Sequence, residues 1–101
     1  MKKVIGGKIY DTETAEEIGG WSNNLGHSDF RNISESLYRT KKGRFFLAGE
    51  GGPMTKYSRR CGDSTGGGED IQPLTHEEAR EWAEEHLSPE EFLKIFVAEE
   101  A

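Results

Sequence analysis

With 101 residues, the chain has the usual length of one domain, so we expect a single domain over residues 1–101. Hydrophobic residues make up only 33% of the chain and the formal net charge is −6. No apolar run approaches the roughly 18 residues of a membrane span, which excludes a membrane-spanning helix. The N-terminus lacks the apolar segment of a signal peptide, and Cys61 is the single cysteine, so we expect a cytoplasmic protein without an internal disulfide.

Charge is divided unevenly along the chain. Residues 1–68 carry 11 basic and 8 acidic side chains, a net +3, whereas residues 69–101 carry 2 basic and 11 acidic ones, a net −9. A difference of this size indicates either a charged surface that binds a partner or an acidic, solvated helical tail.

The first twenty residues contain two predicted elements. Val4 to Tyr10 predicts a small hairpin, because its central Gly-Gly pair supplies the positive φ angles of a type I′ turn and places Val4 opposite Ile9. Asp11 to Gly20 predicts a short helix, with Asp11 or Thr12 as N-cap and acidic residues in its first turn.

The next stretch, Trp21 to Ile33, is polar and lacks periodicity, so we expect a connecting loop. Trp21, Leu25 and Phe30 are the side chains expected to attach this loop to the core. An exposed recognition loop is the alternative, since loops carry much of binding function.

The strongest strand pattern surrounds the turn Lys41-Lys42-Gly43, in which the glycine is expected to adopt a left-handed conformation. The resulting register pairs Leu37 with Leu47 and Tyr38 with Phe46. The two pairs then face opposite sides of the sheet.

Beyond this hairpin the pattern is weaker. Gly49 to Pro53 predicts a wide turn, because it lacks the Gly-Lys-Ser/Thr ending of a phosphate-binding P-loop. Met54 to Arg60 predicts another strand, and Cys61 to Asp70 predicts a flexible glycine-rich loop. Ile71 to Leu74 predicts a short edge strand, because proline is tolerated at sheet edges.

The C-terminus contains two helix starts. Thr75 and Glu78 form the pattern of a capping box, and Ala79, Trp82 and Ala83 follow at helical spacing. The stretch Ser88-Pro89-Glu90-Glu91 repeats the box with proline at the first helical position, and an apolar stripe follows at Phe92, Ile95 and Phe96.

These elements predict an α+β fold. We expect a small antiparallel sheet of three to five strands, with a short N-terminal helix and two C-terminal helices packed on it.

No residue pattern indicates catalysis, a metal or a cofactor. His76 and His86 are ten residues apart and cannot form an i, i+4 metal pair, and no HExxH motif is present. Cys61 lies in an expected mobile loop, which favours a bystander thiol over a nucleophile. We therefore predict a protein that is not an enzyme and that binds no cofactor.

Two charged surfaces remain as candidate binding sites. The first is acidic, on the helix that begins at Thr75, and would dock in a basic groove of a protein partner: Glu77, Glu78, Glu81, Glu84 and Glu85. The alternative is a basic sheet surface that holds nucleic acid, with Tyr38, Phe46 and Tyr57 for base stacking: Arg39, Lys41, Lys42, Arg44, Lys56, Arg59 and Arg60.

Three stretches, YDTETAEEIGGW, SLYRTKKGRFFLAGEGGPMTKY and IQPLTHEEAREW, resemble a family of small uncharacterised proteins of bacteria and their mobile elements. The resemblance implies no catalytic residues. By size, charge and setting, the chain is similar to anti-CRISPR inhibitors, several of which mimic nucleic acid. We therefore predict an inhibitor of a nucleic-acid-handling host defence complex, with a CRISPR effector subunit as the possible partner. The alternative is a nucleic-acid-binding accessory protein that uses the basic hairpin.

Overall fold

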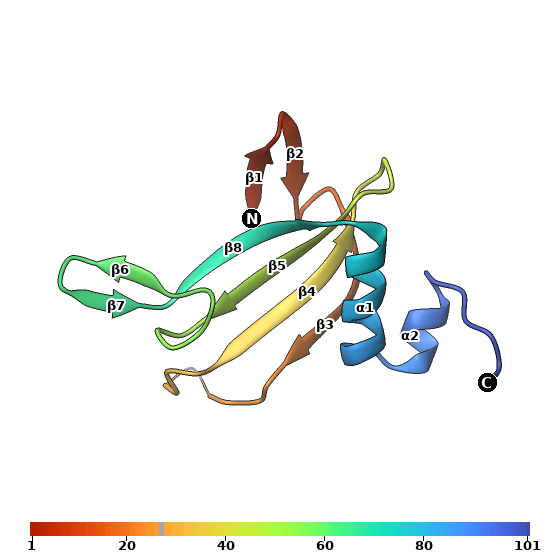
Figure 1. Ribbon diagram of the computed structural model, residues 1–101. Helices are drawn as coiled ribbons and strands as arrows, with labels where there is room; N and C mark the ends of the chain where they lie inside the picture. Colours follow the sequence, from red (N-terminus) through yellow and green to blue (C-terminus); the bar gives the residue numbers. More distant parts are fainter. Residues whose placement is uncertain (27) are drawn as a thin grey trace.

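The computed structural model describes residues 1–26 and 28–101. Its centre is an antiparallel sheet in the order β3-β4-β5-β8, built from β3 (Glu16–Ser22), β4 (Ile33–Arg39), β5 (Phe45–Gly51) and β8 (Gly68–Leu74). The remaining elements lie around it (Figure 1): the hairpin of β1 (Lys2–Ile5) and β2 (Lys8–Asp11), the hairpin of β6 (Arg59–Cys61) and β7 (Ser64–Gly66), and the helices α1 (His76–His86) and α2 (Pro89–Leu93).

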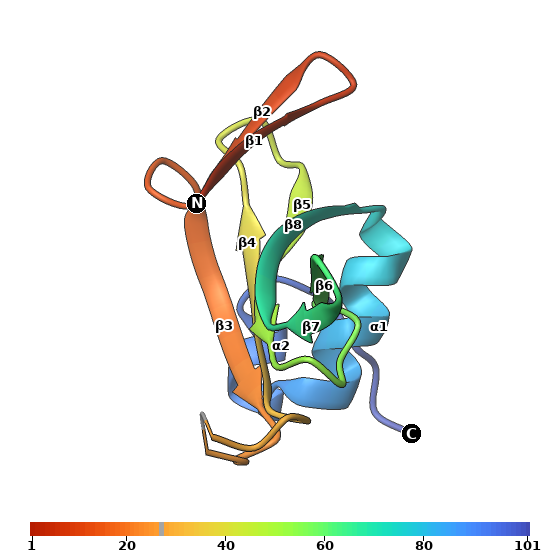
Figure 2. The same cartoon turned by 90° about the vertical axis from the view of Figure 1, so that its left-hand side faces the viewer.

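The predicted class is confirmed in its main features. The central sheet is antiparallel and has four strands, and two helices follow it at the C-terminus. Figure 2, turned by 90°, shows α1 beside the sheet and the β1–β2 hairpin extending beyond one end of the strands.

The central hairpin has the predicted register. Leu37 pairs with Leu47 and Tyr38 pairs with Phe46. Gly43 has a φ of 86°, the left-handed conformation that the turn requires. The sequence of this hairpin therefore encodes both its turn and its pairing.

The sheet separates two apolar clusters. On one face, strand residues pack under α1 and α2, and the members of this cluster are Leu37, Phe45, Leu47, Ala79, Trp82, Ala83, Phe92 and Phe96. On the other face, Tyr10 of the β1–β2 hairpin forms a second cluster with three residues of the sheet, Phe46, Ala48 and Ile71. Side chains alternate between the two faces along β4 and β5, and this alternation places the apolar residues of these strands in one cluster or the other.

The predicted N-terminal helix is wrong. Residues 12–15 form a turn, and Glu16–Ser22 is strand β3, which pairs antiparallel with β4. Asp11 does accept an N–H as expected, but from Glu13 within the turn, at 2.9 Å. A helix of this length is marginal in water on its own, whereas pairing with β4 satisfies the strand's backbone groups through long-range contacts.

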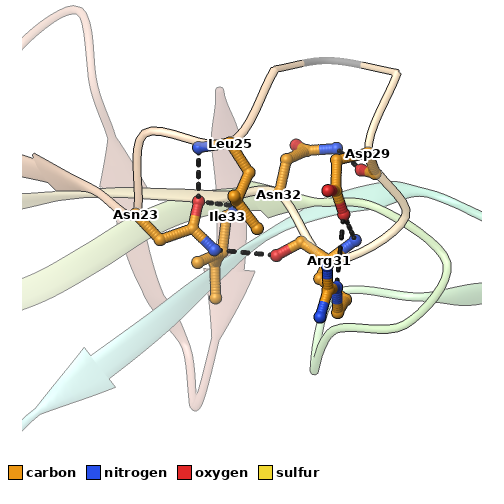
Figure 3. A network of polar contacts seen from close by, with 6 residues as sticks. All are labelled: Asn23, Leu25, Asp29, Arg31, Asn32 and Ile33. Carbon is orange, nitrogen blue, oxygen red and sulfur yellow. Dashed lines mark hydrogen bonds and ion pairs between the residues drawn. The ribbon is translucent and has the colours of Figure 1, made fainter.

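The connection between β3 and β4 was predicted as a loop that attaches to the core, and this is confirmed only at its start. Trp21 belongs to β3 and packs against the helix-side cluster, but Leu25 is 38% exposed and Phe30 is 64% exposed. Polar contacts hold the loop instead (Figure 3): Asn23 bridges its two ends, donating to the carbonyl of Arg31 at 2.8 Å and accepting from Ile33 N–H at 3.2 Å.

A second correction concerns residues 54–70. Most of the predicted strand from Met54 to Arg60 is a series of turns, and Tyr57 is buried there. A Cβ at Gly49 would overlap the Tyr57 ring, so the glycine allows this turn to lie on β5. The predicted glycine-rich loop contains the end of β6, all of β7 and the start of β8, whereas Arg59 and Arg60 of β6 are the part of the predicted strand that is confirmed. The predicted edge strand is confirmed within β8, including Pro73.

Both predicted capping boxes are present. The Thr75 hydroxyl accepts from Glu78 N–H at 3.1 Å, and the Ser88 hydroxyl accepts from Glu91 N–H at 3.2 Å. Trp82 is 8% exposed and lies in the helix-side cluster. Within the described residues, neither helix has the length and apolar composition needed to cross a membrane.

Candidate functional site

The seven basic residues predicted to form one surface do not form one surface. Arg39 pairs with Glu16 at 2.8 Å, Lys56 pairs with the buried Glu35 at 2.7 Å, and Arg59 donates to the carbonyl of Glu69 at 2.7 Å. Arg60 belongs to strand β6 of the second hairpin. The members that remain together are the three at the β4–β5 turn: Lys41, Lys42 and Arg44.

These three cations join two others that come from the N-terminal hairpin. A cleft of about 570 Å³ lies between the β1–β2 hairpin and the β4–β5 turn, and its cationic lining residues are Lys2, Lys8, Lys41, Lys42 and Arg44. We refer to this feature as the basic cleft. Within the described residues, no ion pair joins Lys8, Lys41, Lys42 or Arg44 to a carboxylate. Unsatisfied like charges around a concave surface are suited to binding an anion.

Packing at the base of the β1–β2 hairpin fixes its position beside the sheet. The Tyr10 ring meets Phe46 edge-on, with centroids 5.5 Å apart. Lys3 forms an ion pair with Asp70 of β8 at 2.6 Å, and this pair lowers the pKa of the Asp70 carboxyl. One wall of the basic cleft is therefore attached to the sheet on which the other wall is built.

Among the described residues that line the cleft, Asp11 is the one carboxylate, and its charge is already engaged. One of its oxygens lies 3.6 Å from Lys2 Nζ, and the other accepts from Glu13 N–H. The side chain is only 9% exposed. Asp11 therefore orders the turn after β2 and offsets the charge of Lys2, the one cleft cation that it pairs with among the described residues.

Of the three aromatic side chains predicted for base stacking, two are buried and Tyr38 is half-buried. Phe46 is fully buried and Tyr57 is 7% exposed. The Tyr38 ring is stacked on Phe46, with centroids 5.2 Å apart, and its hydroxyl donates to Glu17 at 3.2 Å. The three rings therefore do not form the open stacking surface that the sequence predicted, because two are buried and one face of the third packs on Phe46.

The five predicted acidic contacts are all exposed on α1, opposite its buried Ala79, Trp82 and Ala83. Glu78 also closes the capping box by accepting from Thr75 N–H at 2.9 Å. Among the described residues, the single ion pair of these carboxylates is a 3.9 Å contact between Glu85 and His86. We call this surface the acidic helix face: Glu77, Glu78, Glu81, Glu84 and Glu85.

The sequence reasoning missed a buried polar network around Glu35. One carboxylate oxygen of Glu35 accepts from Tyr57 Oη at 2.6 Å and pairs with Lys56, while the other accepts from Trp82 Nε1 at 3.0 Å. Burial raises the pKa of Glu35, but the hydrogen bonds from Lys56, Tyr57 and Trp82 and the charge of Lys56 outweigh it, so the pKa is lowered. A glutamate at an inward position of the alternating strand β4 was the signal that could have revealed it.

This network joins parts of the fold and does not line the basic cleft. Both carboxylate oxygens of Glu35 have partners within the protein, and the Glu35 side chain is only 4% exposed. A strongly perturbed carboxylate is a candidate catalytic group when it opens into a cleft with room for a substrate. Glu35 instead links β4 to α1 and to the turn that contains Tyr57.

Comparison of the chain with family models, curated proteins and solved structures finds no match. Among the side chains that the structure describes, no group of three or more His, Cys, Asp or Glu residues is arranged to hold a metal ion. His27 and the side chain of Cys61 lie outside the described residues, so the prediction of a bystander thiol stays a prediction.

Proposed function

We propose that the protein is a non-enzymatic binding protein that holds the phosphate backbone of nucleic acid in the basic cleft. The supporting observation is that five cations from two separate hairpins line one concave surface. Lysine and arginine bind phosphate groups mainly through charge, and each one that neutralises a phosphate releases a counterion. The proposal takes the basic hairpin of the sequence-based alternative and adds Lys2 and Lys8 to it.

The formal net charge of −6 does not oppose this function, because much of the negative charge lies on the C-terminal segment. Interactions between exposed charges fall off within a Debye length of about 8–10 Å at physiological salt. A ligand in the basic cleft therefore responds chiefly to the cations around it.

The second candidate function is inhibition of a nucleic-acid-handling host defence complex, with a CRISPR effector subunit as the proposed partner. The acidic helix face supports it, because its carboxylates are fixed on a helix whose opposite side is buried. In this function the carboxylates replace phosphates in a basic groove of the partner and pair with its Arg and Lys. The resemblance to small proteins of mobile elements favours the same candidate.

Binding of a fluorescein-labelled, mixed-sequence DNA strand, followed by anisotropy at several salt concentrations, tests the first function. The double variant Lys41→Gln/Lys42→Gln removes two cleft cations. The control, Arg60→Gln/Lys94→Gln, removes the same charge from exposed positions outside the cleft. If both cleft lysines contact phosphates, the slope of log K against log salt falls in magnitude by about 1.4 in the first variant and stays unchanged in the control.

Equal loss of DNA binding in the two double variants would show attraction by overall charge and would contradict the cleft function.

To test the second candidate, the triple variant Glu81→Gln/Glu84→Gln/Glu85→Gln is compared with wild type in competition with guide RNA or target DNA for a purified effector. Competition by wild type that the triple variant loses supports the acidic helix face; absence of competition by wild type rules out that effector as the partner.

A further inference from the structure

We infer that the ligand of the basic cleft is a single polynucleotide strand that lies between the two hairpins, and not a duplex. This inference rests on the proposed function and specifies the form of nucleic acid. It follows from three features of the cleft: its size, the distribution of its cations and the position of an exposed aliphatic side chain, Ile9.

The size of the cleft matches a short piece of one strand. Clefts of about 300–1,000 Å³ hold ligands of the size of a nucleotide or a drug molecule. The basic cleft, at about 570 Å³, falls within that range. A duplex would instead take the hairpin into its major groove, which is about 12 Å wide and receives a two-stranded ribbon.

Cations lie on both walls of the cleft. Lys2 and Lys8 belong to the β1–β2 hairpin, whereas Lys41, Lys42 and Arg44 belong to the β4–β5 turn. A strand between the walls places successive phosphates near cations of either wall. A free nucleotide has the same phosphate chemistry but too few phosphates to meet all five cations.

The lining also indicates how the bases are treated. Ile9 lines the cleft and is 65% exposed, so it provides an apolar contact for a base. Among the described residues that line the cleft, Tyr10 is the one aromatic, and it is only 6% exposed because its ring packs on Phe46. Without an exposed ring for stacking, binding depends on the backbone and shows little base preference.

The cross-strand partner of Ile9 offers a matched control. Val4 pairs directly with Ile9 in the hairpin and is also 65% exposed, but it is not among the residues that line the cleft. Ile9→Glu and Val4→Glu therefore introduce the same charge on the same hairpin at equal exposure. For a strand inside the cleft, we expect Ile9→Glu to weaken binding about tenfold or more, because it removes the apolar contact with a base and repels the nearby phosphates; Val4→Glu, on the same face of the hairpin but outside the cleft lining, keeps that contact and should have a smaller effect.

The experiment measures the fluorescence anisotropy of two labelled probes, a single strand and a duplex of the same sequence. Each probe is titrated with wild type, with Ile9→Glu and with Val4→Glu. Unlabelled ADP is then added as a competitor. Tight binding of the strand, weaker binding of the duplex and selective loss in Ile9→Glu support the inference. Equal binding of the duplex, equal losses in the two variants, or competition by ADP as effective as that of the unlabelled strand overturns it while leaving a phosphate-binding cleft in place. Failure of all probes to bind wild type contradicts the proposed function itself.

Discussion

At the residue scale, Glu35 makes the largest set of buried polar contacts described in the fold. Its carboxylate joins three side chains, Lys56, Tyr57 and Trp82, at distances of 2.6 to 3.0 Å. These partners come from the 53–58 turn region and from α1, so a single side chain of β4 holds both against the sheet. Removal of the Glu35 carboxylate leaves the Tyr57 hydroxyl and the Trp82 Nε1–H buried without their charged acceptor, which is costly in a low-dielectric interior.

We expect Glu35→Gln to lower the free energy of unfolding by about 2–4 kcal/mol, because the amide has one acceptor oxygen and no charge for Lys56. Glu17→Gln is the matched control, since Glu17 also accepts from a tyrosine hydroxyl, that of Tyr38, but at an exposed position. Its effect should stay within about 0.5 kcal/mol. Urea unfolding at neutral pH measures both; similar losses in the two variants would contradict the special role of Glu35.

The same network predicts how stability depends on pH. The pKa of Glu35 is lowered in the folded protein, so its contribution is fully present above the unfolded pKa of about 4.3 and is lost as pH falls through the folded value. Burial, the hydrogen bond to Glu35 and nearby negative charge raise the pKa of Tyr57. Its contribution is fully present below about pH 10 and is lost as pH rises beyond that.

Urea unfolding across the pH range therefore should show two limbs, one acidic and one alkaline. Glu35→Gln makes the acidic limb shallower without abolishing it, because Asp29 and Asp70 also have lowered pKa values. Tyr57→Phe makes the alkaline limb shallower. An alkaline limb of unchanged steepness in Tyr57→Phe would show that another group controls it.

At the scale of elements, the sequence predicts those whose signals are local. The turn Lys41-Lys42-Gly43 sets the register of the central hairpin, and the capping residues Thr75 and Ser88 mark both helix starts. In each case, a few neighbouring residues determine the backbone, so the pattern and the structure agree.

The elements that the sequence does not predict depend on distant partners. Residues 11–20 contain an N-cap, acidic residues and a glycine end, yet they contribute a turn and strand β3, because β4 supplies a pairing edge that local signals do not reveal. Tyr57 is similar: its burial depends on Gly49 and on Glu35, which are eight and twenty-two residues away.

The basic cleft could be predicted only in part for the same reason. Lys41, Lys42 and Arg44 are neighbours in the sequence, so their grouping was visible. Lys2 and Lys8 join them through packing of the β1–β2 hairpin on the sheet, by way of Tyr10 and Phe46. A short hairpin with exposed Val4 and Ile9 gives no local indication of where it packs.

At the scale of the whole molecule, charge is arranged in two contrasting surfaces, the basic cleft and the acidic helix face. The acidic surface works against the stability of the free protein. Its carboxylates lie three and four residues apart, where like charges on a helix repel by a few tenths of a kcal/mol per pair. Glu84 and Glu85 also lie near the C-terminal end of α1, where the helix dipole disfavours negative charge.

We therefore expect Glu81→Gln/Glu84→Gln/Glu85→Gln, which changes the formal net charge from −6 to −3, to raise the melting temperature by a few degrees, about 4–8 °C per kcal/mol gained. The control, Glu77→Gln/Glu90→Gln, removes carboxylates from the first turns of α1 and α2, where they favour the helix, and should lower it slightly. Both changes should shrink at about 1 M salt, where the Debye length is about 3 Å. Thermal unfolding followed by circular dichroism measures these changes for wild type and both variants at low and at high salt. A lower melting temperature in the triple variant, or a gain that persists undiminished in high salt, would show that these carboxylates stabilise the fold by specific contacts and that their repulsion is not the controlling effect.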